Sequence, residues 1–311
     1  MAGGAETLRA AAHAIGLAVP IATASSPAEA AGLFARSLPV VPIAVSDPPF
    51  TPGVPSDEGA MLALASLEEA VSLARAGAAL AVATAPIAKV ELAKVGFGFA
   101  GQTEFLAARC GVAAEDAVMM LAGPSLRTVP LTVHCALGQV PELLSVDLLL
   151  RRTRIVARAL RTDFGIAHPR IVVAALNPHA GEGGRFGEEE ARIIAPAIAT
   201  LRAEGLDVTG PHPADALFTP RARRNYDVAV CMYHDQALIP LKALDFDEGV
   251  NVTLGLPIVR TSPDHGTAFD IAGQGIADAG AMAAAIRMAG ECAGRRATLE
   301  QVGSHEDTKM S

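Results

Sequence analysis

The chain has 311 residues, of which 51% are hydrophobic, so it can bury a large core and has the length of about two domains. Its net charge of −8, from 25 basic and 33 acidic side chains, excludes a general attraction to nucleic acid or anionic membranes. No apolar stretch approaches the roughly 18 residues that span a bilayer, and residues 1–20 lack a secretory signal pattern, so we expect a cytoplasmic protein.

Predicted strands and helices alternate along the chain. Residues 40–45 and 79–85 are short apolar runs that predict strands, and residues 67–76 predict a helix. Residues 146–162 predict a long amphipathic helix, and residues 188–204 predict another. The arginines expected on the solvent side of the first of these are Arg151, Arg152, Arg154, Arg158 and Arg161. This alternation predicts an α/β fold with a mostly parallel sheet covered by helices on both faces.

Three histidines each follow a short apolar run of the kind that forms a buried strand. The runs span residues 129–133, 171–178 and 228–233, and the histidines that follow them are His134, His179 and His234. The carboxyl ends of parallel strands meet at one edge of a sheet, where α/β proteins bind ligands. Because neutral imidazoles are good ligands for divalent metals, we predict a metal site that leaves open positions for a substrate.

The residues next to two of these histidines favour a functional site. Residues 177–187 contain four glycines, which allow the backbone to approach a ligand closely after His179. Asp235 follows His234 directly and can orient its imidazole or transfer a proton, and Lys242 follows eight residues after His234.

The segment from Asp264 to Gly275 resembles the adenosine-binding loop of the isopropylmalate and isocitrate dehydrogenases. It reads Asp-His-Gly-Thr-Ala, then Asp-Ile-Ala-Gly-x-Gly, and no strand in the chain is followed by the Rossmann pattern G-x-G-x-x-G. The resemblance implies a dinucleotide, NAD with NADP as the alternative. The cofactor-binding residues that it implies are Asp264, His265, Gly266, Thr267 and Asp270.

Taken together, these motifs resemble the 4-hydroxythreonine-4-phosphate dehydrogenase family of pyridoxal phosphate biosynthesis. The resemblance covers about residues 83–290. It rests on Asn-Pro-His-Ala-Gly-Glu-Gly-Gly at 177–184, Met-Tyr-His-Asp-Gln at 232–236 and Gly-Leu-Pro-x-x-Arg-Thr-Ser-x-Asp-His-Gly-Thr-Ala at 255–268. Matched by motif, the metal ligands of the family fall on the three histidines already identified.

The resemblance also implies an architecture like that of isopropylmalate dehydrogenase, with a cleft between two α/β/α domains. Residues 1–105 plus 248–311 are expected to form the first domain, which carries the dinucleotide loop. Residues 106–247 are expected to form the second, which carries the metal histidines and a dimer interface. Family members open with a strand and a glycine-rich loop, whereas this chain begins later, so we expect an upstream start or an N-terminal strand that is missing from the first domain.

Substrate contacts are implied residue by residue. The substrate-binding lysine, asparagine and arginine of the family fall on Lys242, Asn251 and Arg260. A Gly-His-Thr-Glu-Phe stretch of the family reads Gly-Gln-Thr-Glu-Phe here, which places substrate contacts on Gln102 and Thr103. Gln102 can form hydrogen bonds but cannot become a cation, so an acid-base role at this position is lost.

The reaction implied by the resemblance is the oxidation and decarboxylation of 4-phosphooxy-L-threonine to 3-amino-2-oxopropyl phosphate by a homodimer whose active site lies at the interface. The divalent metal would be zinc, magnesium or cobalt. We assign proton transfer to Lys242, with Asp235 and Asp215 of the Pro-Ala-Asp motif as its acid-base or orienting partners.

Three alternatives remain open from the sequence. The nearest is a related dehydrogenase of another hydroxy acid, such as a phosphorylated sugar acid or an aromatic dihydrodiol carboxylate, which Gln102 would permit. A metal-dependent hydrolase would use the histidines but leave the dinucleotide loop without a role. A binding module without catalysis would leave the histidines as structural residues.

Overall fold

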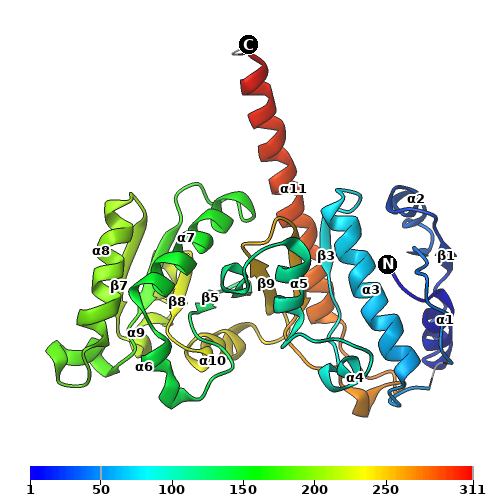
Figure 1. Cartoon of the computed structure of the whole chain (residues 1–311), viewed down its shortest axis with the longest axis horizontal. Helices are drawn as coiled ribbons and strands as arrows, with labels where there is room; N and C mark the ends of the chain where they lie inside the picture. Colours follow the sequence, from blue (N-terminus) through cyan, green and yellow to red (C-terminus); the bar gives the residue numbers. More distant parts are fainter. Residues whose placement is uncertain (50, 310–311) are drawn as a thin grey trace.

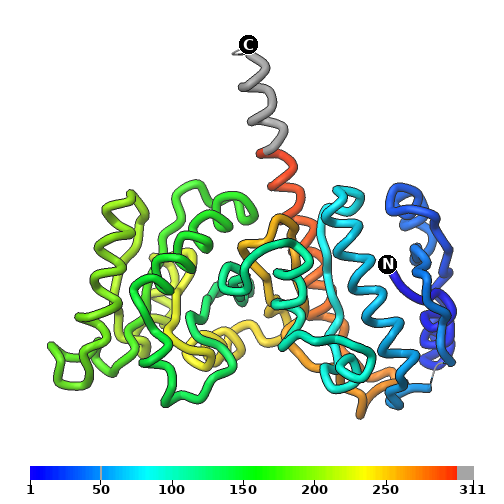
Figure 2. The backbone as a smooth tube through the Cα atoms, viewed as in Figure 1, coloured from blue at the N-terminus to red at the C-terminus, as the bar shows by residue number. Residues whose placement is uncertain are grey.

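The computed structural model describes residues 1–49 and 51–309, with side chains described as far as residue 299, and shows alternating strands and helices (Figure 1, Figure 2). The strands are β1 (Ile21–Thr23), β2 (Leu38–Val40), β3 (Ala81–Ala83), β4 (Val118–Ala122), β5 (Arg127–Pro130), β6 (Arg170–Ala174), β7 (Asp207–His212), β8 (Val228–Cys231), β9 (Val250–Leu254) and β10 (Val259–Pro263). The helices are α1 (Ala5–Ala14), α2 (Pro27–Leu33), α3 (Asp57–Arg75), α4 (Lys89–Lys94), α5 (Gln102–Cys110), α6 (Val140–Leu143), α7 (Val146–Thr162), α8 (Ala195–Ala203), α9 (Ala214–Leu217), α10 (His234–Asp245) and α11 (Gly280–Lys309). The predicted α/β class is therefore confirmed.

Most of the predicted elements lie where the sequence placed them. Helix α7 has the predicted limits, the predicted helix at 188–204 is a π-helical turn followed by α8, and the predicted helix at 67–76 is the second half of α3. The predicted strand at 40–45 is wrong in extent, because β2 ends at Val40. Pro42 lacks the amide hydrogen that a continuing strand needs.

A single eight-stranded sheet runs through both of the domains expected from the sequence, in the order β3-β10-β9-β4-β5-β8-β6-β7. The regions 1–105 plus 248–311 contribute β3, β10 and β9, and β9 pairs with β4 of the region 106–247. Strands β1 and β2 form a separate parallel pair, and Ala2 makes a bridge to Val41 beside it. The division into two domains and the missing N-terminal strand stay predictions.

The prediction of a mostly parallel sheet is wrong in the middle of the sheet. The pairs β10–β9, β9–β4 and β4–β5 are antiparallel, while the pairs on either side of them are parallel. Connections of only four residues, 123–126 and 255–258, join β4 to β5 and β9 to β10. Such short connections can form only hairpins, since a parallel crossover needs a dozen or more residues.

The three strands that precede the histidines are neighbours. Strand β8 pairs in parallel with β5 on one side and with β6 on the other. Their carboxyl ends therefore lie at the same edge of the sheet, as the sequence predicts, and the segments that carry His134, His179 and His234 all leave from this edge.

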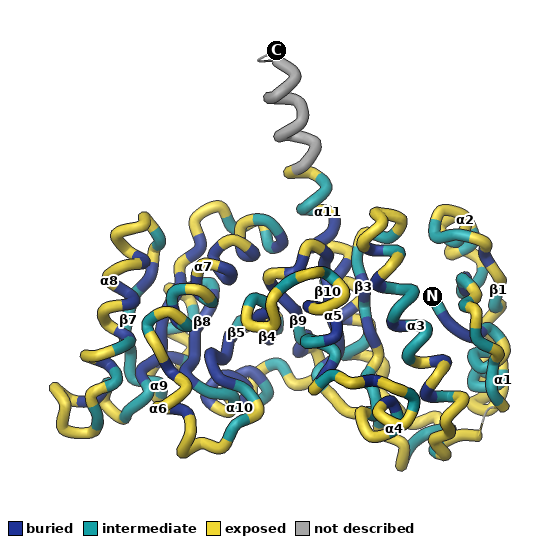
Figure 3. Tube along the Cα trace, viewed as in Figure 1, coloured by how far each residue is buried: buried dark blue, intermediate teal, exposed yellow. Residues whose placement is uncertain are grey.

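Helices cover both faces of this sheet, and the buried residues concentrate along its strands (Figure 3). Ser145 caps the N-terminus of helix α7, since its hydroxyl accepts a hydrogen bond of 3.1 Å from the Leu148 amide. The apolar side of α7 buries Leu149, Val156 and Leu160. On the other face, α10 packs Leu238 and Leu241 against the sheet. Within the described residues, no helix combines the length and the hydropathy needed to cross a membrane.

A buried ion pair joins the end of α7 to α11. The Asp163 carboxylate accepts hydrogen bonds from Arg296 Nε at 2.6 Å and from Arg296 Nη2 at 2.8 Å, and the Asp163 side chain is only 4% exposed. Removing one partner of a buried pair leaves the other charge without compensation.

We therefore expect Asp163→Asn to lower the free energy of unfolding by about 3 kcal/mol, measured by urea denaturation. Asp116→Asn is the matched control, because the Asp116–Arg151 pair lies at the surface and should contribute no more than about 1 kcal/mol. Equal losses in the two variants would contradict the importance of the buried pair.

Candidate active site

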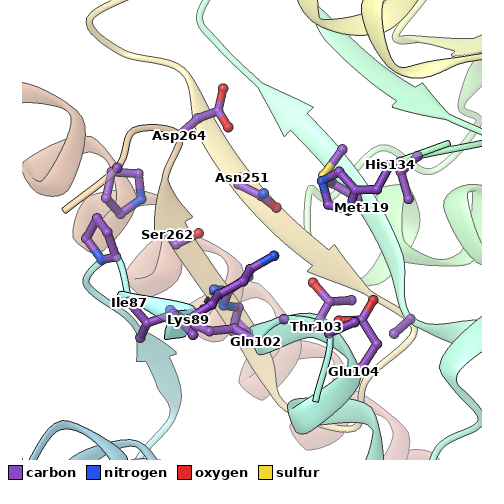
Figure 4. A pocket seen from close by; sticks show the side chains of 18 of the residues that line it. Ile87, Lys89, Gln102, Thr103, Glu104, Met119, His134, Asn251, Ser262 and Asp264 are labelled. Carbon is purple, nitrogen blue, oxygen red and sulfur yellow. Dashed lines mark hydrogen bonds between the residues drawn. The ribbon is translucent and has the colours of Figure 1, made fainter. Parts of the chain in front are cut away.

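A cavity of about 510 Å³ lies at the edge of the sheet where the histidine segments begin. Its walls come from the segment after β3, the N-terminus of α5, strands β4, β9 and β10, the segment after β5 and the start of α10. Figure 4 shows Lys89, Gln102 and Thr103 along one wall, His134 and Met119 at another, and Asn251 between them. The cavity thus collects most of the residues that the sequence predicts to be functional.

His134 and His234 lie side by side in this cavity. Their ring centroids are 6.0 Å apart, and His134 has a left-handed backbone with φ of 49°. Asp235 Oδ1 lies 2.7 Å from His234 Nδ1, so the carboxylate fixes the imidazole and leaves Nε2 available. Asp235 itself does not line the cavity, and its position fits the predicted role of an orienting partner.

His179 does not line the same cavity. Its ring lies beside that of Phe186, with 6.2 Å between the centroids. Among the described residues, no group of three or more His, Cys, Asp or Glu side chains comes together as a metal site. One chain therefore brings together two of the three predicted metal ligands.

The segment that carries His179 has an unusual backbone. Six consecutive residues, 179–184, have positive φ, and three of them are not glycine. A left-handed backbone costs roughly 1–2 kcal/mol for each non-glycine residue. The buried Glu190 stabilises the entry to this segment, since its carboxylate accepts hydrogen bonds from the amides of Leu176 at 2.9 Å and Asn177 at 2.8 Å, and from Asn177 Nδ2 at 3.0 Å.

Arg260 on β10 is 3% exposed and lines the cavity. Its guanidinium donates to Thr253 Oγ1 at 3.0 Å, to Thr84 Oγ1 at 2.8 Å and to Gln102 Oε1 at 2.9 Å, while its Nε has no partner. Burial lowers the pKa of Arg260 to about 10, so it remains a cation at neutral pH. A buried cation held by neutral groups is suited to binding an anion.

Gln102 is the first residue of α5, and both ends of its amide are fixed. Its Nε2 donates to the carbonyl oxygen of Ala85 at 3.0 Å, and its Oε1 accepts from Arg260. The glutamine therefore orients Arg260, which a sequence motif alone did not predict. Thr103, the next residue, also lines the cavity.

Two further predicted substrate contacts, Asn251 and Lys242, lie on the same cavity. Asn251 Oδ1 is buried without a hydrogen-bond partner among the described residues, which leaves an acceptor for a ligand group. Lys242 Nζ lies 2.9 Å from Asp264 Oδ2, so this lysine forms an ion pair with the first residue of the predicted dinucleotide loop.

The residues predicted to bind the dinucleotide divide between two adjoining cavities. Asp264, His265 and Gly266 line the first cavity, while Thr267 lines a second one of about 270 Å³. Asp270 is exposed and lines neither. The cavities share Pro86 and Ile87, so ligands in them would lie next to each other.

Three residues lie in positions that the sequence did not predict. Asp215 is exposed on α9 and does not line the cavity, so its assigned catalytic role is not supported by its position within one chain. The prediction that Arg152 lies on the solvent side of α7 is wrong, because its guanidinium lines the cavity and donates to the carbonyl oxygen of Leu131 at 2.9 Å. Lys89 also lines the cavity and was not predicted from the sequence, although its place after a strand was a usable signal.

Comparison with known proteins gives a consistent result. Residues 1–289 match the family described as pyridoxal phosphate biosynthetic protein PdxA. The chain belongs to this family. The chain is 63% identical over 297 residues to the 4-hydroxythreonine-4-phosphate dehydrogenase of Erythrobacter litoralis, which covers 96% of this chain and 88% of that one. It is 54% identical over 283 residues to the enzyme of the same name from Zymomonas mobilis, with 91% and 84% covered.

Solved structures of two dehydrogenases are also similar to this chain. The crystal structure of 4-hydroxythreonine-4-phosphate dehydrogenase from Klebsiella pneumoniae has a TM-score of 0.85 at 41% identity and covers 94% of this chain and 88% of that one. A terephthalate 1,2-cis-dihydrodiol dehydrogenase from Burkholderia xenovorans has a TM-score of 0.64 at 30% identity, with 93% and 96% covered. Both the TM-score and the identity are thus higher for the Klebsiella enzyme than for the dihydrodiol dehydrogenase.

The role of Glu190 leads to a specific expectation. In Glu190→Gln, the NH₂ group that replaces Oε2 cannot accept from Asn177 Nδ2, and the neutral Oε1 is a weaker acceptor for the amides of Leu176 and Asn177, so the free energy of unfolding should fall by about 1–3 kcal/mol. Amide hydrogens of residues 176 and 177 should also exchange faster. Glu188→Gln is the control, because Glu188 is largely exposed and lies 4.0 Å from Arg192. Unchanged stability and exchange in Glu190→Gln would contradict this role.

Proposed function

We propose that the chain oxidises and decarboxylates 4-phosphooxy-L-threonine to 3-amino-2-oxopropyl phosphate, using NAD and a divalent metal, as a step of pyridoxal phosphate biosynthesis in the cytoplasm. Family membership over residues 1–289 and the activity named for its relatives support this proposal. NADP is the alternative cofactor, and zinc, magnesium or cobalt the candidate metal.

The observation that carries the proposal is the polar centre of the first cavity. Arg260 supplies a buried cation for an anionic group of the substrate, and the unpartnered Asn251 Oδ1 supplies an acceptor for its ammonium or hydroxyl group. Gln102 and Thr103 add donors at the start of α5. A small molecule with a phosphate, a carboxylate and an amine matches this set of groups.

The histidine pair suits a divalent metal, because His134 and His234 are close together and Asp235 orients the second ring. In the proposed reaction, bound metal would polarise the substrate hydroxyl and then the carbonyl group, and NAD would accept the hydride. Because Pro86 and Ile87 line both cavities, a substrate in the first cavity and a dinucleotide in the second would lie next to each other, as hydride transfer needs.

Proton transfer is assigned to Lys242. Its ammonium group is held by Asp264 at 2.9 Å, and both residues line the substrate cavity. In its neutral form, the Lys242 amine would accept the proton of the substrate hydroxyl, and the resulting ammonium group could return a proton after carbon dioxide has left. Arg260 meanwhile keeps the substrate in place.

We further propose a homodimer in which His179 of one copy completes the site of the other. Beside the histidine pair, a hollow of about 250 Å³ is lined by His134, Cys135, Leu137 and Tyr233, and Leu137 is 66% exposed. An exposed apolar side chain beside an incomplete metal site favours cover by a second copy of the chain.

The proposed reaction predicts that the purified chain reduces NAD when it is given 4-phosphooxy-L-threonine and zinc, cobalt or magnesium. NADH absorbance measures the rate, and a chelator should abolish it because the metal is needed to polarise the substrate. Turnover of a terephthalate dihydrodiol or a sugar-acid phosphate, without turnover of 4-phosphooxy-L-threonine, would assign the chain to the alternative dehydrogenase. Absence of NAD binding would contradict both.

The shared site can be tested by mixing inactive variants. His179→Ala and His234→Ala should each be inactive alone, but dissociating and reassociating a 1:1 mixture should restore about a quarter of the wild-type activity. In each mixed dimer, one site then has all three histidines. A mixture of His134→Ala with His234→Ala should stay inactive, because both of these residues belong to the same chain's half of the site. No recovery in the first mixture would contradict the shared site.

A further inference from the structure

Lys89, the first residue of α4, lies on the substrate cavity but is not among the residues matched to the family's substrate contacts. Figure 4 shows its side chain extending into the cavity, with the ammonium end between Asn251 and the start of α5. A Cβ atom placed on Gly101 would lie 3.6 Å from Lys89 Nζ and 3.7 Å from Cε. The end of the Lys89 side chain therefore lies close to Gly101, the N-cap residue of α5.

The surroundings of Lys89 are mostly positive. The N-terminus of α5 carries a partial positive charge, and no side chain caps it. Gln102, the first residue of that helix, accepts a hydrogen bond from the buried Arg260 cation. Two side-chain cations and a helix N-terminus thus meet at one corner of the cavity, which we call the cationic corner: Lys89, Arg260 and the start of α5.

One carboxylate faces the same corner. Glu104 Oε2 would lie 3.1 Å from a Cβ atom on Gly101, but Glu104 forms no ion pair with Lys89 among the described residues. By contrast, Lys94 on the same helix is paired, with 2.6 Å between its Nζ and Glu91 Oε2. A single carboxylate leaves the cationic corner with a net positive charge, which favours the binding of an anion.

Resting on the proposed function, we infer that Lys89 binds the phosphate group of the substrate and selects phosphorylated over unphosphorylated hydroxy amino acids. A phosphate carries nearly two negative charges and three outer oxygens, which matches an ammonium group, a guanidinium group and the amides of a helix N-terminus. Lys89 is a flexible point charge, and the fixed Arg260 provides a directional donor fork. The carboxylate of the substrate, with one charge, would fit this corner less well.

The experiment compares wild type with Lys89→Met, Lys89→Arg and Lys94→Met. Inorganic phosphate is titrated into each protein by calorimetry, which requires no turnover, and KM and kcat are then measured with 4-phosphooxy-L-threonine and 4-hydroxy-L-threonine. For Lys89→Met, we expect phosphate affinity to fall and the KM of the phosphorylated substrate to rise, both by roughly 10- to 100-fold, because a charge-assisted contact is lost. Its kcat, and its KM for the unphosphorylated substrate, should stay within about twofold of the wild-type values.

The two other variants serve as controls. Lys94→Met removes a half-exposed lysine of the same helix that lines neither cavity, so it should leave all values unchanged. Lys89→Arg keeps the charge and should recover most of the phosphate affinity. The inference is overturned if Lys89→Met binds phosphate as tightly as wild type, or if wild type binds none. Loss of phosphate binding in Lys89→Met without turnover by wild type would instead keep the inference and reject the proposed reaction.

Discussion

The arrangement of the substrate cavity depends on one buried cation. Arg260 lies on β10, and its guanidinium group donates hydrogen bonds to three other segments. The acceptors are Thr253 on β9, Thr84 directly after β3 and Gln102 at the start of α5. A guanidinium group with a fixed fork of donors is well suited to link four segments in this way. Because its partners are neutral, its charge remains available to a ligand, and burial makes any attraction to an anion stronger than it would be in water.

The metal side of the site follows from a different constraint, the parallel trio β5-β8-β6. Parallel pairing brings all three histidine segments to one edge, yet the left-handed run after β6 directs His179 away from the pair formed by His134 and His234. Glu190 stabilises that run from within the chain. The hydrogen bonds of Glu190 make the segment that carries His179 rigid. A segment that completes the site of a second copy of the chain would need this rigidity.

Much of the fold and the site could be predicted from local sequence. The hydrophobic period predicted the limits of α7, and the apolar runs predicted the strands before the histidines. Short motifs predicted that Asn251 and Arg260 would lie at the site. Each of these predictions uses only residues that are near each other in the chain. The antiparallel centre was missed because the apolar runs of strands carry no sign of direction, and only connection length reveals it. Arg152 and Lys89 were missed for a related reason. Their neighbours in space come from other elements. Nothing in an arginine-rich helix marks the one arginine that faces a cavity, and the position of Lys89 after a strand was the only local signal for that lysine.

The antiparallel centre of the sheet has a mechanical consequence for the cavity. Strands β9 and β4 pair over five residues, Val250 to Leu254 against Ala122 to Val118, and they join the two parts of the chain that line the cavity. A cleft between domains connected by flexible linkers can open as a hinge. Here the two parts share a hydrogen-bonded ladder, so they cannot swing apart without breaking it. The freedom left to them is a change in the twist of the sheet, in which side chains at its edge move more than those at its centre.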